Sequence, residues 1–232
     1  MGYRVRRGGL LLWVTIGLGV AGSLAAGSAP KSDPGPVKAS SVLDVTPETQ
    51  ARQDNPPTYQ ADNPRNNLHF SFSPSGARIT PLSPSAGAWS LDLALGAFGH
   101  DAEATSPGTA RLSASENHVD YAFEGVRQTF VNGESALEHG FTLAAPPDHR
   151  DPGSETRITL DLAVGGDLVP KRIPPSYFVD FADGGGKTVL RYGPVRATGA
   201  DGSILEAKIK ILPATDEEGP EVRIFVEAEN PV

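Results

Sequence analysis

The sequence predicts an all-β fold, an antiparallel β-sandwich of about ten strands, from three observations. Apolar and polar residues alternate over many short segments, which is typical of strands with one buried and one solvated face. The chain has 232 residues, of which 26 are glycine and 21 proline, and its hydrophobic content is only 38%; such frequent turn residues favour short strands. No long segment has the periodicity of an amphipathic helix. A barrel-like arrangement is the alternative fold.

Met1–Ala29 has the features of an export signal. Three arginines precede an apolar run from Leu10 to Val20, and small residues follow it as far as Ala29. The run is shorter than the roughly 20 residues that a membrane-spanning helix needs, so we expect cleavage rather than a retained anchor. The protein is then expected to be secreted, extracellular or in the cell envelope, with no membrane insertion after signal cleavage.

Residues 30–66 are predicted to be a Pro-rich disordered linker. Prolines recur among scattered serines, aspartates and asparagines, and few residues are apolar. Such a composition cannot bury enough apolar surface to offset the entropy that is lost on ordering. We therefore place the β-sandwich domain at residues 67–232.

The sandwich is expected to begin with strands that have apolar residues at every second position. These residues are Leu68, Phe70 and Phe72 in the first strand, and Trp89, Leu91, Leu93 and Leu95 in a later one. Between them, a turn at residues 74–76 leads into a short strand over 77–80. Residues 99–117 are small and polar, and we expect a loop there with one short strand near Arg111.

The stretch from His118 to Pro147 is predicted to hold three consecutive strands. Val119 and Tyr121 share one face of the first strand, and Phe130 is the best core residue of the second. Asn132–Gly133 is a strong hairpin signal because both residues tolerate the positive φ of a tight turn. The residues of the third strand that are predicted to face the core are Leu137, His139, Phe141 and Leu143.

Further alternating segments complete the expected sandwich. They are residues 158–164, 177–182, 188–192, 195–198, 205–212 and 222–226. The glycine-rich stretches Asp183–Gly186 and Gly199–Gly202 each separate two of these segments, and we expect hairpin connections at both.

Composition narrows the classes of function. The chain has no cysteine, which excludes disulfides, a thiol nucleophile and thiolate metal ligands. Its formal net charge is −8, and loss of the three arginines in Met1–Ala29 takes this to −11. An acidic mature protein argues against nucleic acid and against anionic membrane surfaces as partners.

Runs of sequence over most of the expected sandwich point to one family. They are residues 68–72 with 74–76, 89–93, 119–121, 131–134, 137–143, 166–168, and 190–193 followed by 201–202. Together they resemble the N-terminal domain of secreted bacterial proteins that carry FG-GAP (integrin-alpha-like) or related β-propeller repeats. The resemblance covers about residues 67–230 and implies a surface or extracellular structural module with no catalytic residue.

The family's repeats themselves have no counterpart in the sequence. The chain ends at Val232, where the repeats would begin, and no Asp-x-Asp-x-Asp-Gly calcium loop occurs. The resemblance therefore implies either a stand-alone version of the domain or a truncated reading frame of a longer repeat protein.

No catalytic, cofactor-binding or metal-binding residue is predicted, although two histidines have side chains that could serve in such a site. His139 and Glu138 are neighbours in a strand and so point to opposite faces, which prevents a local acid–base pair; we expect a core or edge histidine with its hydrogen bonds satisfied. His100, Asp101 and Glu103 have metal-ligating side chains, but nothing else at ligand spacing supports a metal site.

Three further motifs are interpreted as chance or structural features. His149–Asp151 spells the kinase catalytic triplet, but the other kinase signatures are missing. Asp183–Gly186 is followed by neither Lys-Ser/Thr nor a helix, so it predicts a hairpin rather than a phosphate loop. Ser135 lacks the G-x-S-x-G elbow of a hydrolase nucleophile.

The leading hypothesis is an exported, monomeric and non-catalytic β-sandwich, a structural or adhesion-type domain that binds an unidentified protein or cell-surface partner without a cofactor. A carbohydrate-binding module is the first alternative, but Trp89 would be the one tryptophan left after signal removal, and its strand position suggests core. A secreted hydrolase with a dispersed site is the second alternative. It requires a pocket in which His139 or His100 meets a carboxylate and a nucleophile.

Overall fold

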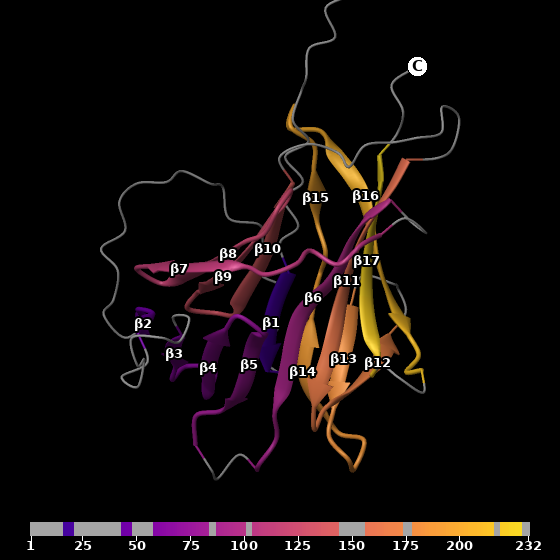
Figure 1. Ribbon diagram of the computed structural model, residues 1–232. Helices are drawn as coiled ribbons and strands as arrows, with labels where there is room; N and C mark the ends of the chain where they lie inside the picture. The colour runs from indigo at the N-terminus through magenta and orange to yellow at the C-terminus, as the bar shows by residue number, and fades with distance from the viewer. Residues whose placement is uncertain are drawn as a thin grey trace, which may run out of the picture.

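The computed structural model describes residues 16–20, 43–47, 58–83, 87–100, 104–143, 156–173, 178–215 and 219–228. Their regular structure is all β-strand, and the strands pair antiparallel in two sheets (Figure 1). Sheet A has the order β12-β13-β14-β1-β10-β9-β8-β7, and sheet B has the order β15-β16-β17-β11-β6-β5-β4-β3-β2. Neither sheet closes into a barrel. The predicted all-β sandwich is confirmed.

The strand bounds follow the alternating segments of the sequence closely. Sheet A consists of β1 (Ile16–Val20), β7 (Arg111–Ser115), β8 (His118–Ala122), β9 (Val126–Asn132), β10 (Leu137–Leu143), β12 (Val169–Ile173), β13 (Phe178–Ala182) and β14 (Thr188–Tyr192). Sheet B consists of β2 (Thr46–Pro47), β3 (Tyr59–Asn63), β4 (Leu68–Ser73), β5 (Gly76–Pro81), β6 (Leu91–His100), β11 (Thr156–Gly166), β15 (Ala197–Thr198), β16 (Ile204–Leu212) and β17 (Glu221–Ala228).

The core lies between the inner faces of the two sheets. Every second residue of β4 is buried, as are the four residues of β10 that were predicted to face inward. Phe72 of sheet B meets Phe130 of sheet A with their ring centroids 5.4 Å apart. Aromatic contacts of this kind join the two layers, and the side chains of both sheets form one continuous hydrophobic cluster.

The hairpin after β9 is confirmed, but its turn differs from the expected one. Asn132 is the last residue of β9, where it pairs with Leu137, and the connecting loop spans residues 133–136. The expectation of a positive φ at Asn132 and Gly133 was wrong, because neither residue has one. Asn132 is 1% exposed, and its side chain makes hydrogen bonds to the backbone of two other segments.

The described strands also extend into segments that were not expected to form them. β2 and β3 lie within residues 30–66, predicted to be linker, because backbone pairing with β4 and burial of Ala61 and Asn63 stabilise β3. β12 contains Pro170, which weakens any strand prediction. Among the described strands, β12 pairs only with β13, at the edge of sheet A, where a proline is tolerated.

The apolar run of the expected signal contributes a strand to sheet A. Residues 16–20 form β1, between β10 and β14 (Figure 1). The rest of Met1–Ala29 lies outside the described residues. Whether this segment is cleaved stays a prediction.

Candidate functional site

Hydrogen-bonding side chains gather on the outer face of β3–β6, in a cluster that we call the polar face. It consists of Gln60, Asp62, His69, Ser71, Arg78, Thr80 and Asp92. Residues directly opposite each other in antiparallel strands share one face of the sheet. The register places Gln60, Ser71, Arg78 and Asp92 in one row across four strands, and Asp62, His69 and Thr80 in the next row.

Asp62, His69 and Ser71 form a hydrogen-bonded chain on the polar face. Nδ1 of His69 lies 2.6 Å from Oδ1 of Asp62, and Nε2 of His69 lies 3.3 Å from Oγ of Ser71. A carboxylate at Nδ1 favours the tautomer in which Nδ1–H donates to Asp62, which leaves Nε2 to accept from the Ser71 hydroxyl. The His69 and Asp62 side chains are 31% and 50% exposed, so this chain is open to solvent.

Arg78 stands opposite Ser71 and is held by Asp92. Its Nε and Nη2 donate to the two carboxylate oxygens of Asp92 at 2.7 and 2.8 Å. This bidentate geometry fixes the guanidinium plane, and the hydrogen bonds that Arg78 donates to Asp92 raise the pKa of Arg78. The row therefore presents an oriented charge pair beside the serine.

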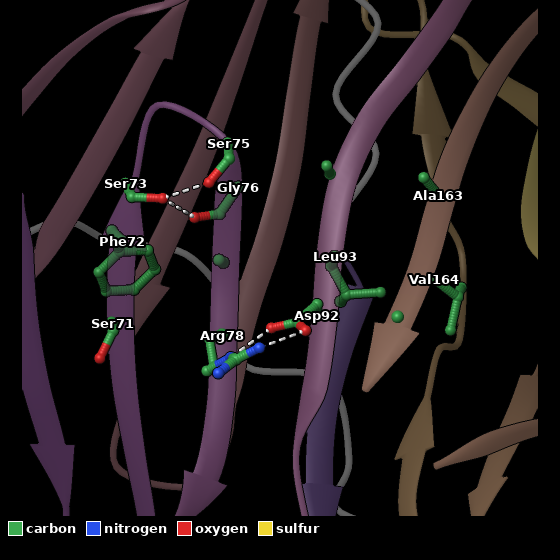
Figure 2. A pocket seen from close by; sticks show the side chains of 13 residues that line it. Ser71, Phe72, Ser73, Ser75, Gly76, Arg78, Asp92, Leu93, Ala163 and Val164 are labelled. Atoms are coloured by element: carbon green, nitrogen blue, oxygen red, sulfur yellow. Dashed lines mark hydrogen bonds and ion pairs between the residues drawn. The ribbon is translucent and has the colours of Figure 1, made fainter. Parts of the chain in front are cut away.

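Two hollows border the polar face. One, of about 530 Å³, extends from Ser71, Arg78 and Asp92 past the β4–β5 turn to β11 (Figure 2). The other, of about 460 Å³, is lined by Gln60, Asp62, His69 and Thr80, together with residues near β2. Small residues, Gly76, Ala94, Ala163 and Gly165 among them, line much of the first hollow.

The chain of Asp62, His69 and Ser71 has the hydrogen-bond order of a Ser-His-Asp triad, but its surroundings differ from those of a hydrolase. β4 pairs with β3 on one side and β5 on the other, so the backbone N–H groups near Ser71 take part in ladders. A hydrolase needs free donors that point at the developing oxyanion. The charged group beside Ser71 is Arg78, and its guanidinium already binds Asp92.

Sequence reasoning missed this site because its three members belong to two strands. The spacing of His69 and Ser71 at i and i+2 does place both on one face of a strand. Asp62 joins them only through the register of β3 with β4, in which Asp62 is opposite His69. That register became predictable only once residues 59–63 were known to be a strand.

His139, the first histidine considered in the sequence, is a core residue as expected. It is 1% exposed, whereas its neighbour Glu138 is exposed. Gln128 Nε2 lies 2.9 Å from His139 Nε2, and the Tyr192 hydroxyl lies 2.9 Å from Nδ1. Burial lowers the pKa of His139 to about 3, so the ring is neutral and both its nitrogens are engaged within the core.

The other candidate residues from the sequence lie away from the polar face. Asp183 caps the β13–β14 hairpin: its side chain accepts from the N–H groups of Gly185 and Lys187, each at 3.0 Å, as the hairpin interpretation predicts. Ser135 is exposed in the β9–β10 loop, and His100 ends β6 with 8% exposure. Residues 101–103 and 149–150, as well as Asp151, lie outside the described residues.

Neither a metal-binding cluster nor a membrane-spanning helix is present in the described part of the chain. It contains no cluster of three or more His, Cys, Asp or Glu side chains suited to a metal ion. Within the same residues, no helix has the length and apolar character required to span a membrane.

Comparison with known proteins adds no relative. No protein-family model, curated protein or solved structure matches the chain.

Proposed function

We propose that the protein is an exported, non-catalytic β-sandwich module that binds a protein or cell-surface partner through the polar face of sheet B. The observation that carries this proposal is the two rows of oriented side chains across β3–β6, bordered by two hollows. Charged, amide and hydroxyl groups held in a sheet register offer directional hydrogen bonds, which give a partner specificity and register.

The rigidity of the strands supports this role. The face lies on four strands that each pair with a neighbouring strand on both sides, so binding costs little ordering of the protein. The Arg78–Asp92 and His69–Asp62 pairs further restrict side chains that would otherwise be mobile. The FG-GAP-like runs described above point in the same direction, to a surface or extracellular module.

The test uses the full chain, secreted from its own host or a related bacterium. We expect the wild-type protein to be retained on cells or envelope fractions, and the double variant Arg78→Ala, Gln60→Ala to lose most of this retention. Arg172→Ala, an exposed change on β12 of the other sheet, is the matched control. Equal retention of all three proteins, or release of all three to the medium, contradicts the proposal.

A glycan array separates the carbohydrate alternative from a protein partner. Trp89 is partly buried against the core, so a sugar would have to bind by hydrogen bonds to the polar face rather than by stacking on this ring. Array binding that the Arg78→Ala, Gln60→Ala variant abolishes assigns the face to a carbohydrate.

A secreted hydrolase is the second candidate function, and the chain of Asp62, His69 and Ser71 is the observation that favours it. In that reaction Ser71 Oγ would bond to the carbonyl carbon of an ester while its proton moved to His69 Nε2. The proton would then pass to the departing alkoxide, and water would hydrolyse the acyl-serine to acid and serine. Asp62 would hold the tautomer of His69 and stabilise its charged form.

Two measurements decide between the candidates. The hydrolase predicts hydrolysis of p-nitrophenyl acetate and labelling by a fluorophosphonate, both abolished in Ser71→Ala and reduced at least 100-fold in His69→Gln. Ser73→Ala, on the same strand face, is the control. If the protein is a non-catalytic module, the ester should be hydrolysed no faster with wild type, Ser71→Ala or Ser73→Ala than in buffer without protein.

A further inference from the structure

Sheet A is completed at its centre by a strand from the far N-terminus. β1 pairs antiparallel with β10 on one side, from Ile16 opposite His139 to Leu18 opposite Leu137. On its other side it pairs antiparallel with β14, from Leu18 opposite Tyr192 to Val20 opposite Leu190. β1, drawn in indigo in Figure 1, therefore joins β12–β14 to β7–β10.

β10 and β14 do not pair directly with each other, because β1 lies between them. Each is antiparallel to β1, so the two run parallel to each other, two strand spacings or about 9.6 Å apart. The residues on these facing edges include Leu137, His139, Leu190 and Tyr192, each no more than 1% exposed. Without a strand between them, N–H and C=O groups in the middle of the sheet would lose their partners, which is costly.

The register defines the chemistry of the strand that fits. Ile16, Leu18 and Val20 are opposite residues that are buried, whereas Gly17 is opposite the exposed Glu138 and Gly19 is opposite the half-buried Arg191. In this register the residues of β1 opposite buried positions are apolar, and the residues between them are glycine. The gap fits an extended segment of five residues in which apolar and small residues alternate.

The frame of the gap is held independently of β1. Tyr192 of β14 reaches His139 of β10 through the 2.9 Å hydrogen bond to Nδ1, and Gln128 of β9 holds the other ring nitrogen. This buried bridge, together with the shared core against sheet B, ties the two parts of sheet A. Loss of β1 would therefore leave a preformed space rather than two separate sheets.

We propose that the gap between β10 and β14 is a strand-acceptor site, which Ile16–Val20 fill while the N-terminal segment remains attached. Once the signal is removed, the site takes an extended segment of the same alternating apolar and small chemistry from a partner chain. Binding by strand addition combines main-chain hydrogen bonds with pockets for alternate side chains. Binding of a partner segment rests on the export part of the proposed function, whereas the existence of the acceptor site does not. The acceptor site lies in sheet A, and the polar face lies on sheet B.

The test cuts the folded full chain. A protease recognition sequence placed in residues 30–40 allows cleavage after folding, and a fluorescent synthetic peptide covering residues 12–22 with a terminal lysine tag then serves as the probe. We expect the cut N-terminal fragment to co-elute with the body in gel filtration and to be displaced by excess peptide. A peptide with Leu18→Asp should bind at least 100-fold more weakly, whereas Leu12→Asp, outside β1, should bind like the parent peptide.

Amide exchange locates the binding. Removal of the fragment should speed exchange in β10 and β14, and the peptide should restore protection there without changing β3–β6. Immediate loss of the fragment with unchanged exchange in β10 and β14 overturns the proposal, as does dimerisation of the cut body, because a second copy would then fill the gap. Retention of the Arg78→Ala, Gln60→Ala variant on cells would contradict the proposed role of the polar face in binding. It would not affect the conclusion about peptide binding between β10 and β14.

Discussion

His139 has a side chain that is often catalytic in proteins, but here it lies in the core and its role is structural. Its ring stacks on Phe130 with centroids 4.1 Å apart and also contacts Phe141. If Gln128 donates to Nε2, then Nδ1–H donates to the hydroxyl oxygen of Tyr192, and the neutral imidazole has both nitrogens satisfied. A buried histidine of this kind specifies the packing of β9, β10 and β14 and is not exposed to any substrate.

His139 should make the protein less stable as the pH falls. Its pKa is lowered to about 3 in the folded state by burial, whereas the unfolded chain takes up the proton near pH 6.5. Its contribution is therefore complete above pH 6.5 and declines between pH 6.5 and 3, by up to about 1.4 kcal/mol per pH unit. Urea unfolding at pH 7, 6 and 5 measures this slope.

The comparison variant for this slope is His139→Gln, which cannot take up the proton. Its free energy of unfolding should fall less steeply with pH than that of wild type, even though its stability at pH 7 is lower. His118→Gln, a half-buried position at the start of β8, should keep the wild-type slope. Parallel curves for wild type and His139→Gln would show that the histidine is not buried in the folded state.

Phe141 and Thr142 test the orientation of β10 directly. Phe141 is 0% exposed, so Phe141→Asp places an unpaired charge in the core and should prevent soluble folding. Thr142 is half-buried on the outer face, opposite Arg127, and Thr142→Asp should change the free energy of unfolding by no more than about 0.5 kcal/mol. Thermal melts and soluble yield check both, and the opposite order would mean that the register of β10 is shifted by one residue.

At the scale of elements, buried asparagines tie the edge of one sheet to a hairpin of the other. Asn132 of β9 donates from Nδ2 to the carbonyls of Leu43 and Asp62 at 3.1 and 2.9 Å. Its Oδ1 accepts from Asn63 of β3 at 3.0 Å, and Asn63 also donates to Gly133 O at 2.8 Å. One side chain thus joins β9, β3 and the segment before β2, which explains why these short strands are ordered.

Asn132→Ala should therefore destabilise the protein by about 2–4 kcal/mol, because two carbonyls and the Asn63 amide lose their partner in a buried site. Chemical unfolding gives the value, and amide exchange should show the loss first in β2 and β3. Ser135→Ala, in the exposed part of the same hairpin loop, should lie within about 0.5 kcal/mol of wild type. An equally small effect of Asn132→Ala would mean that water replaces the asparagine without cost.

The same elements show where sequence reasoning works and where it stops. β4, β10 and β11 were predictable because alternation depends only on the strand itself. The burial of β4 follows this alternation, whereas in β11 Thr159 and Asp161, between the apolar residues, are buried as well. β3 was not, since its stability comes from pairing with β4 and from Asn63, which a composition rule counts as polar and disordered. The polar face escaped prediction for the same reason, because Asp62 meets His69 only through that pairing.

At the scale of the whole molecule, the two sheets share one core rather than forming two units. Buried residues from both sheets belong to a single hydrophobic cluster. Chain connections also cross between the layers: β10 in sheet A leads to β11 in sheet B, and β14 in sheet A leads to β15 at the edge of sheet B. Neither sheet can lose its partner without exposing its whole inner face, so unfolding should be one cooperative transition.

Trp89 allows that cooperativity to be measured from the sheet opposite to a mutation. It lies just before β6 of sheet B and packs against the core, and in a Trp13→Phe background it is the only tryptophan. Phe141→Ala in sheet A should cost about 3–5 kcal/mol and lower the midpoint of thermal unfolding by roughly 6–20 °C. Because the core is shared, Trp89 fluorescence and far-ultraviolet circular dichroism should shift by the same amount. A fluorescence transition that stayed at the wild-type midpoint while the dichroism shifted would mean that sheet B folds without sheet A.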